Sequence, residues 1–203
     1  MRKALITIGV LIAALAILTA ARAPQKKQSA GAGISVGAAD ALQSKIDTLK
    51  KKSEETTAGA DPRPTEEIQV SESELASYVM HSLREQIPVQ VEAFKVQLTA
   101  GAVGADAELN IAEPTGAALV DALVGGRHSL FVKGKLSGAE RRGRFELDEV
   151  RVDGIPVPKV LVETLFTKYV KPRYPYADLK EPFDLPWGIE RLTIEPKKAH
   201  ILY

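Results

Sequence analysis

Apolar and polar residues alternate in the middle of the chain, as they do in β-strands with one buried face. Residues 89–99 alternate with a change of parity near Ala93, which indicates a β-bulge. Ala100 and Gly101 then supply a tight turn, and residues 103–111 carry the alternation back. The apolar positions of the return strand include the small residues Ala105 and Ala107. We therefore expect a hairpin whose second strand lets a bulky element, such as a helix, approach closely.

The same alternation returns in residues 127–137 and 144–152, again with a parity slip in the second stretch. Residues 138–143 are predicted to form the loop between them. The outward positions are mostly Lys, Arg, Glu and Asp, so this second hairpin belongs to an antiparallel sheet with one solvated face. Alternation resumes near Leu192, turns at residues 195–198 and continues to Tyr203, which predicts a closing pair of strands.

Two helices flank these strands in the sequence. The first begins with a capping box, in which Ser71 caps the helix and Glu74 reaches back to the backbone of Ser71; Pro88 is predicted to end it. The second follows the corner 153–158, with Pro158 at a favourable first-turn position. Its apolar stripe is wide, and Lys171 and Pro172 terminate it. A stripe of this width predicts burial against the sheet or against another apolar surface.

Two further segments are open to more than one interpretation. Residues 113–126 are either a short helix packed in the core or an apolar lip on a groove. Residues 40–55 carry Leu42, Ile46 and Leu49 at helical spacing between two linker-like stretches. They are interpreted as a short helix with a solvated end, or alternatively as a coiled-coil seam or a helix lying on a membrane surface. The folded domain is expected to begin near Ile68.

The N-terminus carries a targeting pattern. Met1, Arg2 and Lys3 precede an uncharged apolar run, residues 4–21, which Arg22 ends. As a helix this run spans ~27 Å, close to the ~30 Å hydrocarbon thickness of a bilayer. It is also longer than the usual apolar region of a signal peptide. We expect a single-pass anchor in the cytoplasmic membrane, with the rest of the chain outside the cytoplasm (periplasmic). The alternative is a cleaved signal peptide and a secreted protein.

Together these patterns predict an α+β domain, a long curled antiparallel sheet packed on two or three helices. The expected organisation is an anchor or signal segment at residues 1–23, a linker with a short helix at 24–67, and the domain at 68–203. A net charge of +1 argues against nucleic-acid binding. The absence of cysteine removes disulfides, thiolate metal sites and cysteine nucleophiles.

The sequence holds no spacing typical of a catalytic or metal site. His81, His128 and His200 are far apart, and neither a Gly-x-Ser-x-Gly elbow nor a phosphate-binding loop occurs. Carboxylate pairs such as Asp148 with Glu149, or Asp178 with Glu181, arise readily by chance in a chain with 26% charged residues. We therefore predict no enzyme, no catalytic residue, no metal and no cofactor.

The order of these elements resembles that of a class of bacterial envelope proteins. Those proteins carry one N-terminal anchor and a domain similar to the tubular lipid-binding (TULIP-like) superfamily, of the YceB, YpmS and LmeA kind. The resemblance covers roughly residues 68–203 and rests on three motifs. They are Ser71, Glu74, Leu75 and Tyr78; Gly154, Ile155, Pro156, Val157 and Pro158; and Leu185, Pro186, Gly188 and Ile189. It implies a curled sheet wrapped around helices, with an apolar groove able to take acyl chains.

Two functions follow as expectations. The first is a membrane-anchored, non-catalytic protein that binds or handles lipid, with phospholipid or another acyl-chain molecule as the ligand. The second is an envelope scaffold or protein-interaction module with a filled core and an unknown protein partner. For the first, the candidate groove residues are apolar positions between helix and sheet: Leu119, Leu123, Val160, Leu161, Leu165, Phe166 and Trp187. A continuous apolar cavity favours lipid binding, whereas a filled core favours the scaffold.

Overall fold

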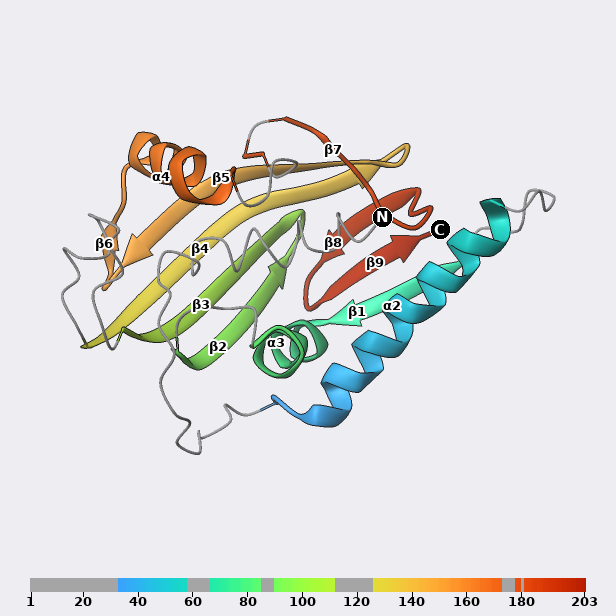
Figure 1. The fold of residues 1–203 in the computed structure, drawn as a ribbon, viewed down its shortest axis with the longest axis horizontal. Helices are drawn as coiled ribbons and strands as arrows, with labels where there is room; N and C mark the ends of the chain where they lie inside the picture. The colour runs from blue at the N-terminus through green and yellow to red at the C-terminus, as the bar shows by residue number, and fades with distance from the viewer. Residues whose placement is uncertain (1–32, 58–65, 85–89, 112–125, 173–177, 180) are drawn as a thin grey trace.

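The computed structural model describes residues 33–57, 66–84, 90–111, 126–172, 178–179 and 181–203 (Figure 1). The predicted anchor at residues 1–23 lies outside these ranges, as does the ambiguous segment 113–126 except for Gly126, which begins β4. In the described part the fold is α+β, with a long antiparallel sheet and three α-helices, as the sequence predicted. The strands are β1 (Glu67–Ser71), β2 (Gln90–Thr99), β3 (Ala102–Ile111), β4 (Gly126–Ala139), β5 (Arg142–Val152), β6 (Ile155–Pro156), β7 (Phe183–Asp184), β8 (Arg191–Glu195) and β9 (Lys198–Leu202).

The sheet is built on the long hairpin of β4 and β5. Strands β3 and β2 pair in succession along the first part of β4, from Gly126 to Lys135. Farther along the same edge, Gly138 pairs with Leu192 of β8, and β9 and β1 follow outward from β8. The hairpin thus holds two smaller sheets side by side (Figure 1).

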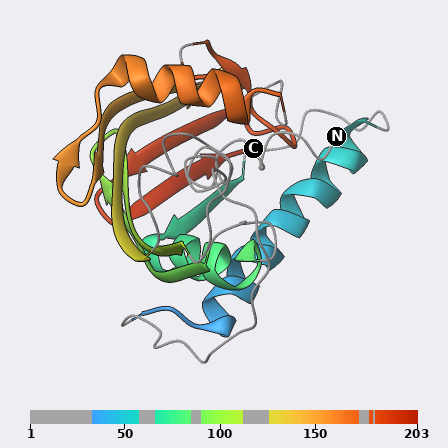
Figure 2. The same ribbon diagram turned by 60° about the vertical axis from the view of Figure 1, so that its left-hand side comes forward.

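The tips of two other hairpins close the seam between these smaller sheets. Gly101, in the β2–β3 turn, donates its N–H to the carbonyl of Ile194, with an N···O distance of 2.9 Å. Lys197, in the β8–β9 turn, donates to the carbonyl of Leu98 at 3.0 Å. Two backbone hydrogen bonds therefore join turns that are nearly a hundred residues apart in the chain. The whole sheet curves around one apolar face (Figure 2).

Both predicted parity breaks are confirmed as irregularities in the strand register. One lies between Val91 and Ala93 of β2, and the other lets Asp148 of β5 bulge out opposite Lys133 and Gly134. Bulges increase the bend and twist of a strand, so these two contribute to the curvature of the sheet.

The predicted loop at residues 138–143 is wrong, because the ladder of β4 and β5 continues through it. Gly138 pairs with Gly143 and Ala139 with Arg142, leaving a two-residue turn at Glu140 and Arg141. Both turn residues have positive φ, 52° and 62°, as a type I′ hairpin turn requires. Because the turn residues are Glu and Arg rather than the usual Asn-Gly, the sequence did not indicate a two-residue turn. The glycine at position 143 also lets β7 pack closely against β5, because a Cβ there would lie 2.5 Å from the Phe183 ring.

Helix α3 (Glu72–His81) confirms the predicted capping box. The Ser71 hydroxyl accepts from the backbone N–H of Glu74, and the Glu74 carboxylate accepts from the backbone N–H of Ser71 at 2.8 Å. The helix ends at His81, earlier than the predicted stop at Pro88, with the N–H of Ser82 bonded to the carbonyl of Tyr78.

Helix α2 (Val36–Thr57) is part of the packed unit. The sequence assigned this stretch to a linker carrying a short helix, with its end in solvent. In the structure Leu42, Ile46 and Leu49 are all buried and join the same apolar core as the strands. Their spacing of three and four residues forms one stripe. Helix α2 packs against α3, which lies beside it (Figure 2). The packed part of the chain therefore includes residues well before Ile68.

The third helix, α4 (Lys159–Leu165), contacts β5 at the end of the fold away from α2 and continues into a π-helical turn, η2 (Phe166–Val170) (Figure 2). Pro158 is its N-cap rather than its first helical residue. The helix is anchored by Val162 and Phe166, which are 2% and 5% exposed. These two residues lie four apart and therefore on one face.

Candidate functional site

A cavity of about 730 Å³ lies on the inner, apolar face of the sheet. Its floor is formed across three strands by Phe94 and Val96 of β2, Ala107 of β3 and Leu130 of β4. Its wall is formed by the first turns of α3, including Ala76, and by Ile34 just before α2. Strands lie ~4.8 Å apart in a sheet, so a cavity that runs from β2 to the end of β5 is roughly 14 Å wide.

The cavity exists because β3 carries small inward side chains. Ala107 pairs with Phe94 on one side and with Leu130 on the other, so a methyl group lies between two large side chains. On the facing helix α3, Glu72, Ser73 and a further small residue, Ala76, border the cavity. The sequence predicted that a helix could approach these small residues closely. The structure instead leaves open space there.

The cavity is also bordered by residues of the opposite strand parity, some of them charged. Lys95, Asp106 and Phe131 alternate with the inward residues, so their side chains point to the outer face of the sheet. On that outer face the Arg151 guanidinium lies 4.3 Å from the centre of the Phe131 ring. The side chains on the inner floor, Phe94, Val96, Ala107 and Leu130, are apolar.

Two polar contacts fix the wall of the cavity. Strand β2 is at the edge of the sheet, and the N–H of Leu98 donates to the Glu72 carboxylate at 2.6 Å, which ties α3 to that edge. Ser77 is fully buried, and its hydroxyl accepts from the backbone N–H of Ser35 at 3.1 Å. This second bond holds the chain at Ile34 against α3.

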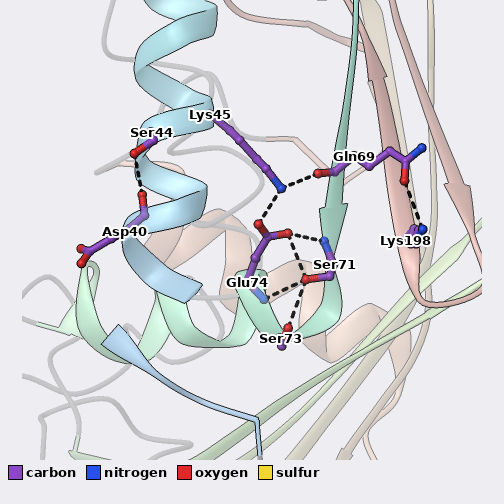
Figure 3. Close-up of polar contacts among 8 residues, drawn as sticks. All are labelled: Asp40, Ser44, Lys45, Gln69, Ser71, Ser73, Glu74 and Lys198. Atoms are coloured by element: carbon purple, nitrogen blue, oxygen red, sulfur yellow. Dashed lines mark hydrogen bonds and ion pairs between the residues drawn. The ribbon is translucent and has the colours of Figure 1, made fainter. Parts of the chain in front are cut away.

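Lys45 of α2 joins three elements behind this wall (Figure 3). Its ammonium donates to the Glu74 carboxylate at 2.5 Å and to the backbone carbonyl of Gln69 in β1 at 2.6 Å. Burial alone raises the pKa of Glu74. Hydrogen bonds from Lys45 and Ser71 outweigh burial, so the pKa of Glu74 is lowered overall. The ionised carboxylate therefore stabilises both the helix cap and the contact with α2.

A polar pair lies where the cavity reaches the end of β5. His128 has the same strand parity as Leu130, and its Nδ1 lies 2.7 Å from an Asp153 carboxylate oxygen. The other Asp153 oxygen accepts from the backbone N–H of Ser129 at 2.8 Å. The hydrogen bond from His128, followed by that from Ser129, lowers the pKa of Asp153. Ser129 and Gly154, the chain neighbours of this pair, border the cavity, whereas His128 and Asp153 themselves do not.

The groove residues predicted from the sequence lie elsewhere. Leu119 and Leu123 are outside the described residues. Val160 is 74% exposed, and Leu161 and Leu165 are half-buried. Phe166, at the C-terminal end of α4, is buried. Trp187 is half-buried beside the core, with the Lys50 ammonium 5.5 Å from its ring centre. None of these five described residues borders the cavity.

The remaining histidines occupy solvated positions. His81 is exposed at the end of α3. His200 on β9 contacts the carboxylate of Glu67 through Nδ1 and lies 3.4 Å from that of Glu195 through Nε2. Hydrogen bonding to His200 lowers the pKa of Glu67. Within the ranges that the structure describes, no group of three or more His, Asp or Glu side chains is arranged to hold a metal ion.

Among the described helices, none has the length and apolar character needed to cross a membrane. Comparison with known proteins gives no relative from which a function could be transferred: no family model, curated protein or solved structure matches the chain. The function must therefore be argued from the cavity and its surroundings.

Proposed function

We propose that this protein is a membrane-anchored envelope protein that binds the acyl chain of a lipid in the cavity between α3 and the sheet, without catalysing a reaction. The observation that carries the proposal is the cavity of about 730 Å³ on the apolar face of the sheet. Small-molecule sites typically enclose about 300–1,000 Å³ and are lined mainly by apolar side chains. The floor of Phe94, Val96, Ala107 and Leu130 matches that description.

An acyl chain is the ligand that suits such a floor. Burying apolar surface contributes roughly 25 cal/mol per Å² and needs no directional partner. The inward side chains of the floor offer no hydrogen-bonding group, so polar ligand atoms lying on the floor would lose their contacts with water without replacing them. Polar side chains border the cavity at its wall, at Glu72 and Ser73 of α3. The resemblance to envelope proteins with a tubular lipid-binding domain supports the same conclusion.

The apolar run at residues 4–21, preceded by Arg2 and Lys3, supports a position at the outer face of the cytoplasmic membrane. A lipid-binding domain held there would be close to a supply of its ligand. Analysis of the intact mass of the protein from isolated membranes tests this position, because an uncleaved anchor retains residues 1–23.

A second candidate function is a protein-interaction module. One observation favours it: Ile155 of β6 and Val160 of α4 are 69% and 74% exposed on the same corner of the fold. Contiguous exposed apolar patches mark protein interfaces, and these two side chains would form the centre of such a patch. Substituting both by serine would weaken a protein partnership through this corner and would leave lipid binding intact.

Native mass spectrometry of the full chain, purified from membranes in mild detergent, tests lipid binding directly. We expect a bound lipid, or uptake of added phospholipid or fatty acid. Ala107→Phe places a ring in the cavity and should abolish binding. Gln97→Phe is the matched control, because Gln97 is exposed on the outer face of β2. Absence of bound lipid in the folded wild type under all mild conditions, with no uptake of either probe, would refute the proposal.

A further inference from the structure

Three large apolar side chains are exposed in the described part of the chain, and they lie on two sides of the cavity. They are Val36, Ile155 and Val160, which are 60%, 69% and 74% exposed. Val36 lies two residues after Ile34, which borders the cavity. Ile155 directly follows Gly154, which borders the same cavity. Single exposed apolar residues are common on protein surfaces, but their gathering beside one cavity indicates a surface that contacts something apolar.

The composition of the stretch 154–160 favours a bilayer over a protein as that partner. Pro156, Pro158 and Lys159 are exposed in it beside the two apolar side chains. Lys159 is the one charged residue in the sequence from 154 to 162, and the stretch holds no Trp, Tyr or Arg, the residues that dominate protein interfaces. Aliphatic side chains can enter the boundary between headgroups and acyl chains. The lysine stem lies along that apolar surface while its ammonium contacts lipid phosphate.

The length of the N-terminal chain allows this contact. The predicted anchor ends at residue 23, and Gly33 is among the residues that border the cavity. Ten residues of chain span at most about 35 Å. The cavity is roughly 14 Å wide by the spacing of its strands, so both of its sides are within that reach of the membrane. A domain tethered so closely meets the bilayer surface at a high effective concentration.

We propose that the border of the cavity docks onto the surface of an anionic lipid bilayer, with Val36 on one side and Ile155, Lys159 and Val160 on the other. This inference rests on the proposed anchor and acyl-chain site, and it adds the surface through which they work together. Docked in this way, the cavity lies beside the bilayer at Gly154. An acyl chain then passes between the bilayer and the cavity with little exposure to water.

Site-specific fluorescence quenching tests the docked orientation. Because the chain has no cysteine, a single introduced cysteine carries the fluorophore. Thr164→Cys is suitable, since Thr164 is exposed one helical turn after Val160. The full chain is placed in vesicles of phosphatidylcholine and phosphatidylglycerol, part of the lipid bearing a nitroxide quencher on its acyl chain. We expect quenching several times stronger at Thr164→Cys than at Ser137→Cys. Ser137 is exposed near the β4–β5 turn, whereas β6 pairs with the other end of β5.

Two sets of variants in the Thr164→Cys background identify the contacts. Ile155→Ser combined with Val160→Ser should lower the docked fraction about tenfold or more, because burying one such side chain already changes a partition constant by about that factor. Both positions are exposed, so the variant should fold, and circular dichroism checks this. Lys159→Gln should weaken docking about fivefold on vesicles with phosphatidylglycerol and little on phosphatidylcholine alone. Lys135→Gln, exposed on the outer face of β4, is the matched control.

The outcomes separate this inference from the proposed function. Equal quenching at the two labelled positions refutes docking, as does quenching at Thr164→Cys that survives both serine substitutions. If that label is instead shielded from aqueous iodide only in native membranes, a protein covers the corner. Bound lipid in native mass spectrometry without such quenching leaves the proposed function standing. Quenching in a protein that takes up no lipid confirms the contact with the bilayer and refutes the acyl-chain site.

Discussion

Glu74 has an unusually central position for a single carboxylate. It completes the cap of α3 through Ser71 and forms the ion pair with Lys45, which also binds the edge of β1 (Figure 3). The side chains of Lys45 and Glu74 are 32% and 14% exposed, so solvent screens this pair less than a surface salt bridge. The orientation of α3, and with it one wall of the cavity, therefore depends on the ionisation of Glu74.

The stability of the fold should consequently depend on pH through this residue. The pKa of Glu74 is lowered from its ordinary value of 4.5, so its contribution is complete above that value and is lost as the pH falls through the lower value of the folded state. Glu74→Gln should decrease the free energy of unfolding by about 1–3 kcal/mol at pH 7, and this difference should shrink below pH 4. Urea denaturation across pH 3 to 7 measures it. Glu54→Gln, exposed on α2, should change little; an equal loss in both variants, or a difference independent of pH, would contradict the argument.

Among the elements, α2 is the one whose role in the fold depends most on tertiary packing and is least evident from its sequence. Its apolar stripe is short, and the helix is followed by residues of linker-like composition. Leu42, Ile46 and Leu49 nevertheless belong to the apolar core. A helix of this kind gains most of its stability from tertiary contact rather than from intrinsic propensity.

Truncating the centre of that stripe tests whether α2 is an integral element. Ile46→Ala should lower the free energy of unfolding by about 2–5 kcal/mol, as expected for a buried residue that leaves a cavity. Thr48→Ala is the control, because Thr48 is exposed and bonds only to the carbonyl of Ser44 in its own helix. Thermal unfolding of the full chain measures both. If Ile46→Ala and Thr48→Ala had equal effects, α2 would not be packed as described.

The elements also show which predictions the sequence could support. Both central hairpins and their bulges were predictable, because alternation within a strand depends only on neighbouring residues. The inner face of α4 was not, since Val160, Leu161, Val162, Leu165 and Phe166 are all apolar and define no single face. The structure buries Val162 and Phe166 and exposes Val160. The cavity could not be predicted either. The small residues Ala105 and Ala107 indicate available space, but the packing of α3 decides whether that space is filled.

At the scale of the whole molecule, the cavity couples ligand binding to stability. A lipid that binds only the folded chain stabilises it by RT ln(1 + [L]/Kd), about 2.7 kcal/mol at a ligand concentration of 100 Kd. For a protein of this size, each kcal/mol raises Tm by roughly 2–4 °C. Palmitate at that concentration should thus raise the Tm of the wild type by roughly 5–10 °C, a shift that differential scanning calorimetry resolves.

Filling the cavity should raise the Tm of the lipid-free protein and abolish the further rise in Tm caused by palmitate. Ala107→Phe replaces empty space with an apolar ring, and cavity-filling substitutions commonly add about 0.5–2 kcal/mol. The variant should therefore melt a few degrees above the lipid-free wild type and show no further shift with palmitate. Gln97→Phe, on the outer face of the neighbouring strand, should keep the full ligand-induced shift. A palmitate shift that persists in Ala107→Phe would mean that lipid stabilises the protein from another site, and the space between α3 and β3 would then be only a packing defect.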